Sequence, residues 1–312
     1  MATVSNPTQS KRMAARYHDG MNRRSFLTGA ATVAASLLTL HLPRWARAIG
    51  PGSELHFGEL GFGGGSSGGG TGHSRSGLER LGWELAFRTS IEVARENPVA
   101  VSIAGGGEKL FETPFLYLSG SRRFPLPQAR ELEVLRRHLT FGGMLLIDSA
   151  EGRAGGDFDA SVRQLVTALF PASTGPAPGT GPAAGLVPVP ADHVIHKSFY
   201  LTRGAAGRVA VAPSLEALFL GGLGGGGAPG AASAAGRAAI VYSQNDLGGA
   251  WAKDHLGNWA YQCIPGGEMQ REQAFRLGIN LVMYAMCLDY KTDQVHVPFI
   301  MKRRRWKPDD EL

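Results

Sequence analysis

The sequence has little cysteine, and this limits its redox and metal chemistry. Cys263 and Cys287 are the two cysteines among 312 residues. They do not form a CxxC pair, which excludes the usual thiolate sites for zinc or an iron–sulfur cluster. Cys287 lies in the apolar run LVMYAMCL, typical of a packed core thiol, whereas Cys263 lies in a loop bounded by Gly and Pro. A disulfide between the two stays an open alternative.

Excess charge of one sign is also lacking once the first 48 residues are set aside. The whole chain carries a formal charge of +6. Residues 1–48 hold seven basic residues and one acidic residue, so the remainder has 32 − 7 = 25 basic and 26 − 1 = 25 acidic residues. A nucleic-acid partner is not expected, because non-specific binding to phosphates needs a basic excess. The basic run MKRRRWKP near the C-terminus is interpreted as a solvated tail, with docking to an acidic partner or lipid as the alternative.

The N-terminal segment has the parts of a twin-arginine signal peptide. Arg23 and Arg24 precede the apolar run Thr28–Leu40, about 13 residues long. A membrane-spanning helix needs roughly 20 apolar residues. The segment ends in an A-x-A cleavage signal formed by Ala46 and Ala48. We therefore expect residues 1–48 to direct export to the periplasm, leaving no transmembrane helix after cleavage; an uncleaved anchor is the alternative.

The remaining chain alternates strand and helix patterns, which predicts an α/β fold. Apolar strand candidates are LHFGEL, VAVSIA, PFLYLSG, MLLID and RAAIVYS. Amphipathic helix candidates cover residues 76–96, 127–142, 157–170 and 268–290, and Asp157 or Asp159 is placed to cap the third of them. A strand, a helix and a second strand form a βαβ unit, so we expect a mostly parallel sheet flanked by helices.

Glycine-rich stretches interrupt this pattern without adding a cofactor motif. They lie near residues 62–72 and 221–230, and a Pro/Gly/Ala loop covers 171–185. One frame of the first stretch matches G-x-G-x-x-G, but the run is of low complexity and no acidic residue follows at the required distance. We interpret these stretches as insertions in one domain, residues 49–290, followed by a basic tail, 291–312. The sequence requires no cofactor.

Several blocks resemble the domain-of-unknown-function family 4159. They occur in family order over roughly residues 54–290 and read FGGMLLIDSAEG, FDASVRQL, DHVIHKSFY, IVYSQNDLGGAW and QAFRLGINLVMYAM. The resemblance implies a flavodoxin-like domain similar to class I glutamine amidotransferases. It also implies envelope partners, because such proteins are often encoded beside MoxR-type ATPases and von Willebrand A-domain proteins. No activity is established for the family.

The segment LLIDSAEG departs from what an amidotransferase needs. Those enzymes use a cysteine on a tight turn between strand and helix, activated by a histidine. The corresponding turn here holds Asp148 and Ser149, so glutaminase activity is not expected. A second departure is LSGSRRF, where Ser121 and Arg122 stand in a stretch in which relatives tend to have a histidine.

A serine hydrolase or a metal-dependent enzyme is the rival hypothesis. Ser149 could act as nucleophile with His193 or His196 as base and Asp246 or Asp148 as orienting group, because all lie in segments expected near one sheet edge. The G-x-S-x-G turn is absent, however, and turn formation explains Asp148 and Ser149 more simply.

The same histidines raise the question of a metal site. His193 and His196 are three residues apart and could share a metal with Asp157, Asp159 or Asp246. No H-E-x-x-H signature accompanies them, and a surface turn packed on Phe199 and Tyr200 is the alternative interpretation.

Two further groups of polar residues are candidates for ligand binding. Ser243, Asn245 and Asp246 directly follow a buried strand, where open α/β sheets bind ligands. Arg276, with Gln273 and Asn280, is spaced along one helix face and forms either a solvent-facing stripe or a wall of the same site. The leading expectation is an exported, non-catalytic module that binds a ligand or protein.

Overall fold

The computed structural model describes residues 54–62, 72–104, 107–171, 185–220 and 236–286. The expected signal peptide, the basic tail, Cys287 and the glycine-rich stretch 221–230 lie outside these residues, as do most of 62–72 and 171–185. Cys263 is a buried free thiol, and burial raises its pKa. Within the described ranges, no helix is both long and apolar enough to cross a membrane.

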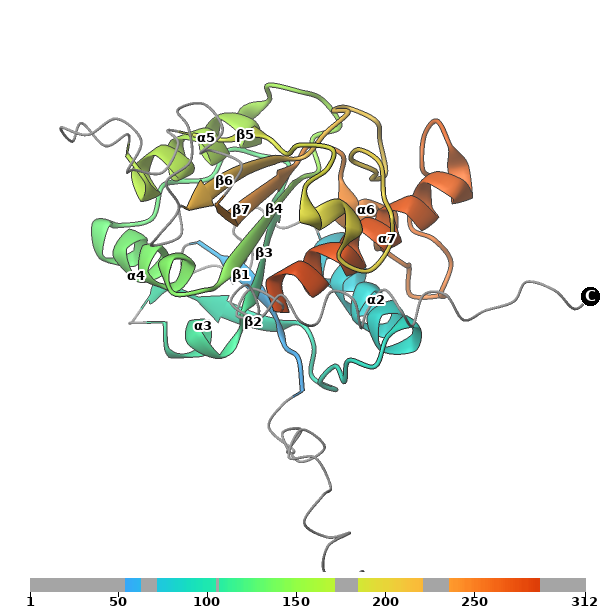
Figure 1. Ribbon diagram of the computed structural model, residues 1–312, viewed down its shortest axis with the longest axis horizontal. Coiled ribbons are helices and arrows are strands. Elements are labelled where there is room, and N and C mark those ends of the chain that lie inside the picture. The colour runs from blue at the N-terminus through green and yellow to red at the C-terminus, as the bar shows by residue number, and fades with distance from the viewer. Residues whose placement is uncertain (1–53, 63–71, 105–106, 172–184, 221–235, 287–312) are drawn as a thin grey trace, which may run out of the picture. The chain divides into compact units, whose positions relative to one another are not determined.

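A seven-stranded sheet forms the centre of the described chain (Figure 1). Its strands lie in the order β2-β1-β3-β4-β7-β6-β5. In chain order, the strands are β1 (Phe57–Gly61), β2 (Val99–Ser102), β3 (Phe115–Gly120), β4 (Met144–Ser149), β5 (Val187–Pro188), β6 (Glu216–Leu220) and β7 (Arg237–Ser243). The predicted strand segments are therefore confirmed as members of one sheet.

The first five strands of that order are parallel to one another, as the βαβ pattern predicts. β3 and β4 are buried along their whole lengths, which explains why their sequences are almost continuously apolar. The order β2-β1-β3-β4-β7 is that of flavodoxin-like sheets. The expected α/β fold, with a mostly parallel sheet, is confirmed.

The next strand of the order, β6, runs in the opposite direction, and β5 at the edge is antiparallel to β6 in turn. β6 pairs with β7 so that Glu216 faces Tyr242 and Phe219 faces Ala238. β6 therefore begins at the carboxyl end of β7 and finishes at its amino end. β5 pairs with β6, also antiparallel. This register fixes which residues can meet at each end of the sheet.

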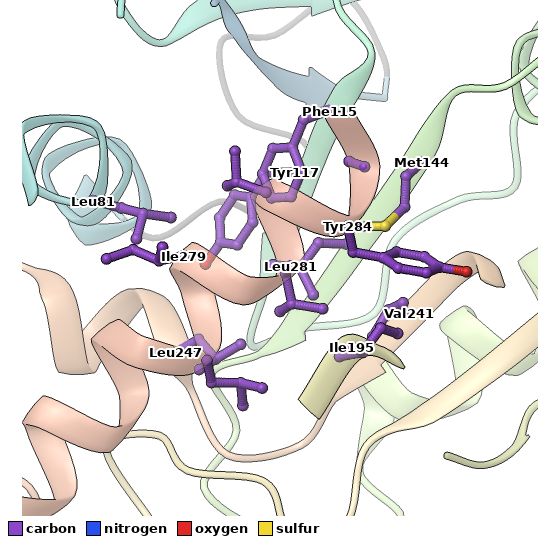
Figure 2. Close-up of a cluster of buried hydrophobic side chains, with 14 of the residues drawn as sticks. Leu81, Phe115, Tyr117, Met144, Ile195, Val241, Leu247, Ile279, Leu281 and Tyr284 are labelled. Carbon is purple, nitrogen blue, oxygen red and sulfur yellow. The ribbon is translucent and has the colours of Figure 1, made fainter. Parts of the chain in front are cut away.

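Helices cover both faces of the sheet (Figure 1). α2 (Gly72–Arg88), α6 (Leu247–Trp251), α7 (Gly267–Met286) and the short 3-10 helix η3 (Val194–Lys197) pack on one face. α3 (Glu108–Glu112), α4 (Ala129–Thr140) and α5 (Asp157–Leu169) pack on the other. We call these the α7 face and the α5 face. Figure 2 shows the core of the α7 face, where Tyr117, Leu281 and Val241 come from three different elements.

Two local expectations need correction. The helix expected over 76–96 ends at Arg88. The residues that follow bond the backbone of Leu55, just before β1, instead of continuing the helix: Leu55 N–H donates to Glu92 O, and Ala94 N–H donates to Leu55 O. Neither Asp157 nor Asp159 caps α5. Its N-cap is Gly156, and Glu151 accepts the Asp159 N–H at 3.2 Å in place of a capping side chain.

Candidate functional site

Asp148 and Ser149 end β4 and point to opposite faces of the sheet. Successive side chains of a strand alternate between faces, and Leu146 packs on the α7 face whereas Ile147 packs on the α5 face. Asp148 accordingly reaches Tyr117 of the α7-face core, at 2.8 Å from its hydroxyl. Ser149 lies on the α5 side. The two adjacent residues therefore belong to separate sites.

On the α7 face, Asp148 holds the start of α6. Its Oδ1 accepts the Leu247 N–H at 2.9 Å, and its Oδ2 accepts the Gly248 N–H at 2.7 Å as well as the Tyr117 hydroxyl. A Cβ on Gly248 would lie 2.4 Å from the Tyr117 oxygen, so this close approach requires glycine. Asp148 thus ties β4, β3 and α6 together.

Asp246 completes this arrangement, which we name the Asp148 cluster: Asp148, Tyr117, Asp246, Arg208 and the first turn of α6. Asp246 has φ 56°, the left-handed region, and is the one non-glycine residue there within the described chain. Its carboxylate accepts the Gly249 N–H at 2.9 Å and pairs with the Arg208 guanidinium. The strained backbone is held by these contacts on both sides.

Burial and charge shift the acidity of this cluster. Burial, followed by the negative charge of Asp246, raises the pKa of Asp148 to about 7, although its three hydrogen-bond donors oppose the shift. Burial and the neighbouring Asp148 raise the pKa of Tyr117 well above its ordinary value. The raised pKa therefore belongs to a carboxyl group that is closed to solvent.

Two of the predicted ligand-binding residues serve the fold. Asn245 is fully buried, and its amide bonds the loop that crosses the end of β7: Oδ1 accepts two N–H groups, and Nδ2 donates to the carbonyls of Ala205 and Ala212. Ser243 Oγ accepts the Asn245 N–H at 3.2 Å. The structure brings Ser243, Asn245 and Asp246 together at the carboxyl edge, as expected.

On the α5 face, a second set of polar side chains gathers at the same edge. We name it the Tyr242 cluster; its members are Ser149, Glu151, Asp159, Arg163, Glu216, Tyr242 and Gln244. Arg163 bonds Asp159 Oδ2 at 3.0 Å and both oxygens of Glu216, and Gln244 Nε2 donates to Glu216 at 3.0 Å. Burial, and then the Asp159 carboxylate, raises the pKa of Tyr242.

His193 does not lie at this edge, so the expectation that it meets Ser149 is wrong. Its ring packs on Phe219 and Tyr284, with ring centroids 5.3 and 5.7 Å apart. Both partners mark the amino end of β7, since Phe219 pairs with Ala238 and the Ala238 N–H donates to the Tyr284 hydroxyl. The five steps along β7 from Ala238 to Ser243, which pairs with Asp148, correspond to roughly 16 Å at about 3.3 Å per residue.

His196 and Arg276 also have partners of their own. The buried His196 ring lies 3.3 Å from the Thr202 hydroxyl, and burial lowers its pKa. Arg276 pairs with Glu272 at 2.8 Å and lies over the Tyr200 ring. Asn280, expected on the same helix face, is fully buried and bonds the backbone of Phe199 and Tyr200. These residues support the 196–202 segment.

A metal centre is not assembled from the described side chains. Across the ranges that the structure covers, no group of three or more His, Cys, Asp or Glu residues could hold a metal ion. The proposed set of His193 and His196 with an aspartate is therefore not brought together there.

Several residues of the two clusters were missed by the sequence reasoning. Tyr117 and Tyr242 lie inside apolar strand segments and resemble ordinary core residues. Their position one or two residues before the polar strand ends, on a known face, was a usable signal. Arg208 and Glu216 carry no such signal, because loop crossing and antiparallel register bring them to the site.

A sheet of this order, with helices on both faces and polar side chains at its carboxyl edge, defines a doubly wound α/β protein. The chain belongs to the domain-of-unknown-function family DUF4159, whose family model matches residues 56–286. No curated protein matches the chain significantly. The family resemblance inferred from the sequence blocks is confirmed.

Proposed function

We propose that this DUF4159 chain is a non-catalytic module that binds a ligand or protein at the carboxyl edge of its sheet. The supporting observation is the engagement of Asp148. At the turn that, by the family resemblance, corresponds to the cysteine position of an amidotransferase, this carboxylate accepts two hydrogen bonds from the first turn of α6 and one from Tyr117 of β3. A group used in this way holds the fold and is not presented to a substrate.

The position of Ser149 supports the same proposal. A serine nucleophile needs a base within hydrogen-bond reach and a group that orients the base. Ser149 lies on the α5 face, whereas Asp148 lies on the α7 face and His193 at the amino end of β7. The separation of Ser149 from Asp148 and from His193 supports the non-catalytic proposal.

Turnover by the purified chain tests the non-catalytic proposal. Glutamine and a panel of amides and esters are offered to the wild type, to Ser149→Ala and to Asp148→Asn, with Ser102→Ala as the control. Ser102 is an exposed serine on the edge strand β2. We expect all four proteins to give the same background rate. Turnover that Ser149→Ala alone abolishes would establish the hydrolase instead.

We also propose that the chain is exported through the twin-arginine route to the periplasm. Changing Arg23 and Arg24 to Lys keeps the charge but removes the planar guanidinium forks. We expect the full-length double variant to stay in the cytoplasm, measured by fractionation, whereas a control with Arg12 and Arg16 changed to Lys is exported. Equal export of both variants would contradict the proposed route.

The proposed partners are envelope proteins, including those that carry MoxR-type ATPase or von Willebrand A domains. This proposal rests on the family resemblance and on the predicted signal peptide. Crosslinking of the full chain in intact envelopes, followed by identification of the joined peptides, tests it. Crosslinks to such proteins from residues at the carboxyl edge support the proposal, and crosslinks confined to the opposite edge contradict it.

A further inference from the structure

The Tyr242 cluster contains three buried polar atoms that lack hydrogen-bond partners. They are the Tyr242 hydroxyl, Asp159 Oδ1 and Gln244 Oε1. Their residues are 1%, 7% and 8% exposed. Within the described residues, none of the three atoms has a hydrogen bond of normal geometry; the Tyr242 hydroxyl has only weaker interactions with the Asp159 carboxylate, which raises its pKa, and with the Ser149 hydroxyl, which lowers it. Buried polar atoms are normally satisfied, so this set indicates a missing partner.

The three atoms belong to one connected group. Tyr242 faces Glu216 across the β6–β7 pairing, and Gln244 leaves the same strand end two residues later. Gln244 and Arg163 both bond Glu216, and Arg163 also bonds Asp159. Ser149 lies beside Tyr242, since it too acts on the pKa of that hydroxyl. The three atoms therefore lie in one network of polar side chains.

The chemistry of the cluster favours a cationic donor. The cluster contains three carboxylates and one guanidinium. The carboxylates belong to Asp159, Glu216 and Glu151, which accepts the Asp159 N–H, and the guanidinium belongs to Arg163. Their formal sum is two negative charges. The free positions on Asp159 and Gln244 are acceptors only, and the Tyr242 oxygen also accepts.

We propose that the Tyr242 cluster binds a primary ammonium group. Such a group carries three N–H donors, which match the oxygens of Asp159, Gln244 and Tyr242. The network also reaches the surface, because the Arg163 side chain, which bonds Asp159, is 45% exposed. The inference rests on the proposed binding role of this sheet edge and names the chemistry that the edge recognises. The ammonium can come from a small free amine or from a lysine side chain.

Binding of defined amines to the purified full chain tests the proposal. The probes are methylammonium chloride and capped lysine amide, with tetramethylammonium chloride and sodium chloride at equal ionic strength as controls without N–H donors. Affinity is measured from the rise in Tm with concentration and from the NMR signal of ¹⁵N-labelled methylammonium. The variants are Asp159→Asn, Tyr242→Phe and Gln244→Leu. Asp157→Asn is the matched control, because Asp157 lies on the same helix but is exposed and pairs with Arg123.

We expect methylammonium to raise Tm while the two control salts do not. Removing the Asp159 charge should weaken its affinity at least about tenfold, as the loss of a charge-assisted hydrogen bond does, and Asp157→Asn should leave it unchanged. Tyr242→Phe keeps the test valid if Asp159→Asn folds poorly. Binding of capped lysine as well as methylammonium identifies a protein lysine as a possible source, and binding of methylammonium alone identifies a free amine.

Two results would overturn the proposal. One is an equal response to methylammonium, tetramethylammonium and sodium. The other is a methylammonium affinity that both Asp159→Asn and Tyr242→Phe leave intact; an internal water would then be the partner of these atoms. Turnover is measured without amine, so the failure of this site and the failure of the non-catalytic proposal are distinguishable.

Discussion

The two polar clusters lie at the same edge of one sheet, on opposite faces, and they differ in how their hydrogen bonds are satisfied. In the Asp148 cluster, both carboxylate oxygens of Asp148 have donors. In the Tyr242 cluster, three buried polar atoms have no hydrogen bond of normal geometry among the described residues. Polarity at a carboxyl edge therefore does not by itself mark a binding site. Whether the buried polar atoms of a cluster already have hydrogen-bond partners distinguishes a group that stabilises the fold from one that can bind a ligand.

Among changes to the two clusters, removal of the Asp148 carboxylate should lower the free energy of unfolding most. Asp148→Ala leaves the N–H groups of Leu247 and Gly248 and the Tyr117 hydroxyl buried without an acceptor. We expect a loss of about 3–5 kcal/mol in the free energy of unfolding, measured by urea denaturation. Asp157→Ala, on an exposed aspartate, should change it by less than about 0.5 kcal/mol. Similar losses for the two variants would show that Asp148 does not hold α6.

A methyl group on Gly248 should have the next largest effect. In Gly248→Ala the new Cβ would lie 2.4 Å from the Tyr117 oxygen and 3.5 Å from Asp148 Oδ2. We expect a loss of about 1–3 kcal/mol from overpacking. Adding Tyr117→Phe removes the clashing oxygen, so a double-mutant cycle should recover part of the loss. Strictly additive losses would place the strain elsewhere.

The acidity of Asp148 predicts a pH dependence of the stability of the Asp148 cluster. Its pKa is raised to about 7 in the folded chain, above the value of an unfolded aspartate. The folded state therefore binds an extra proton between about pH 4 and pH 7, and stability falls as the pH rises through that window. Compared with Asp148→Asn, the wild type should lose free energy of unfolding from pH 5 to pH 8. A constant difference between the two proteins would contradict the raised pKa.

The sequence predicted much of the fold but less of the site. Apolar runs such as PFLYLSG and MLLID identified the strands, and alternation along MLLIDS already places Asp148 and Ser149 on different faces. The alternation is not visible as a change between polar and apolar residues, because both faces of the strand are buried and every residue is apolar until the strand ends. The antiparallel return of β6 could not be predicted, and it carries Glu216 to the site and places Phe219, the partner of His193, away from it.

Paired substitution of the two buried tyrosines tests the central distinction most directly. Tyr117→Phe and Tyr242→Phe each remove one hydroxyl, the first bonded to Asp148 and the second without a hydrogen bond of normal geometry among the described residues. We expect Tyr117→Phe to lower the free energy of unfolding by about 1–2 kcal/mol and to keep the response to methylammonium. Tyr242→Phe should leave stability within about 0.5 kcal/mol, or raise it, and lose that response. The opposite pattern, with Tyr242→Phe destabilised and Tyr117→Phe insensitive to methylammonium, would contradict the account.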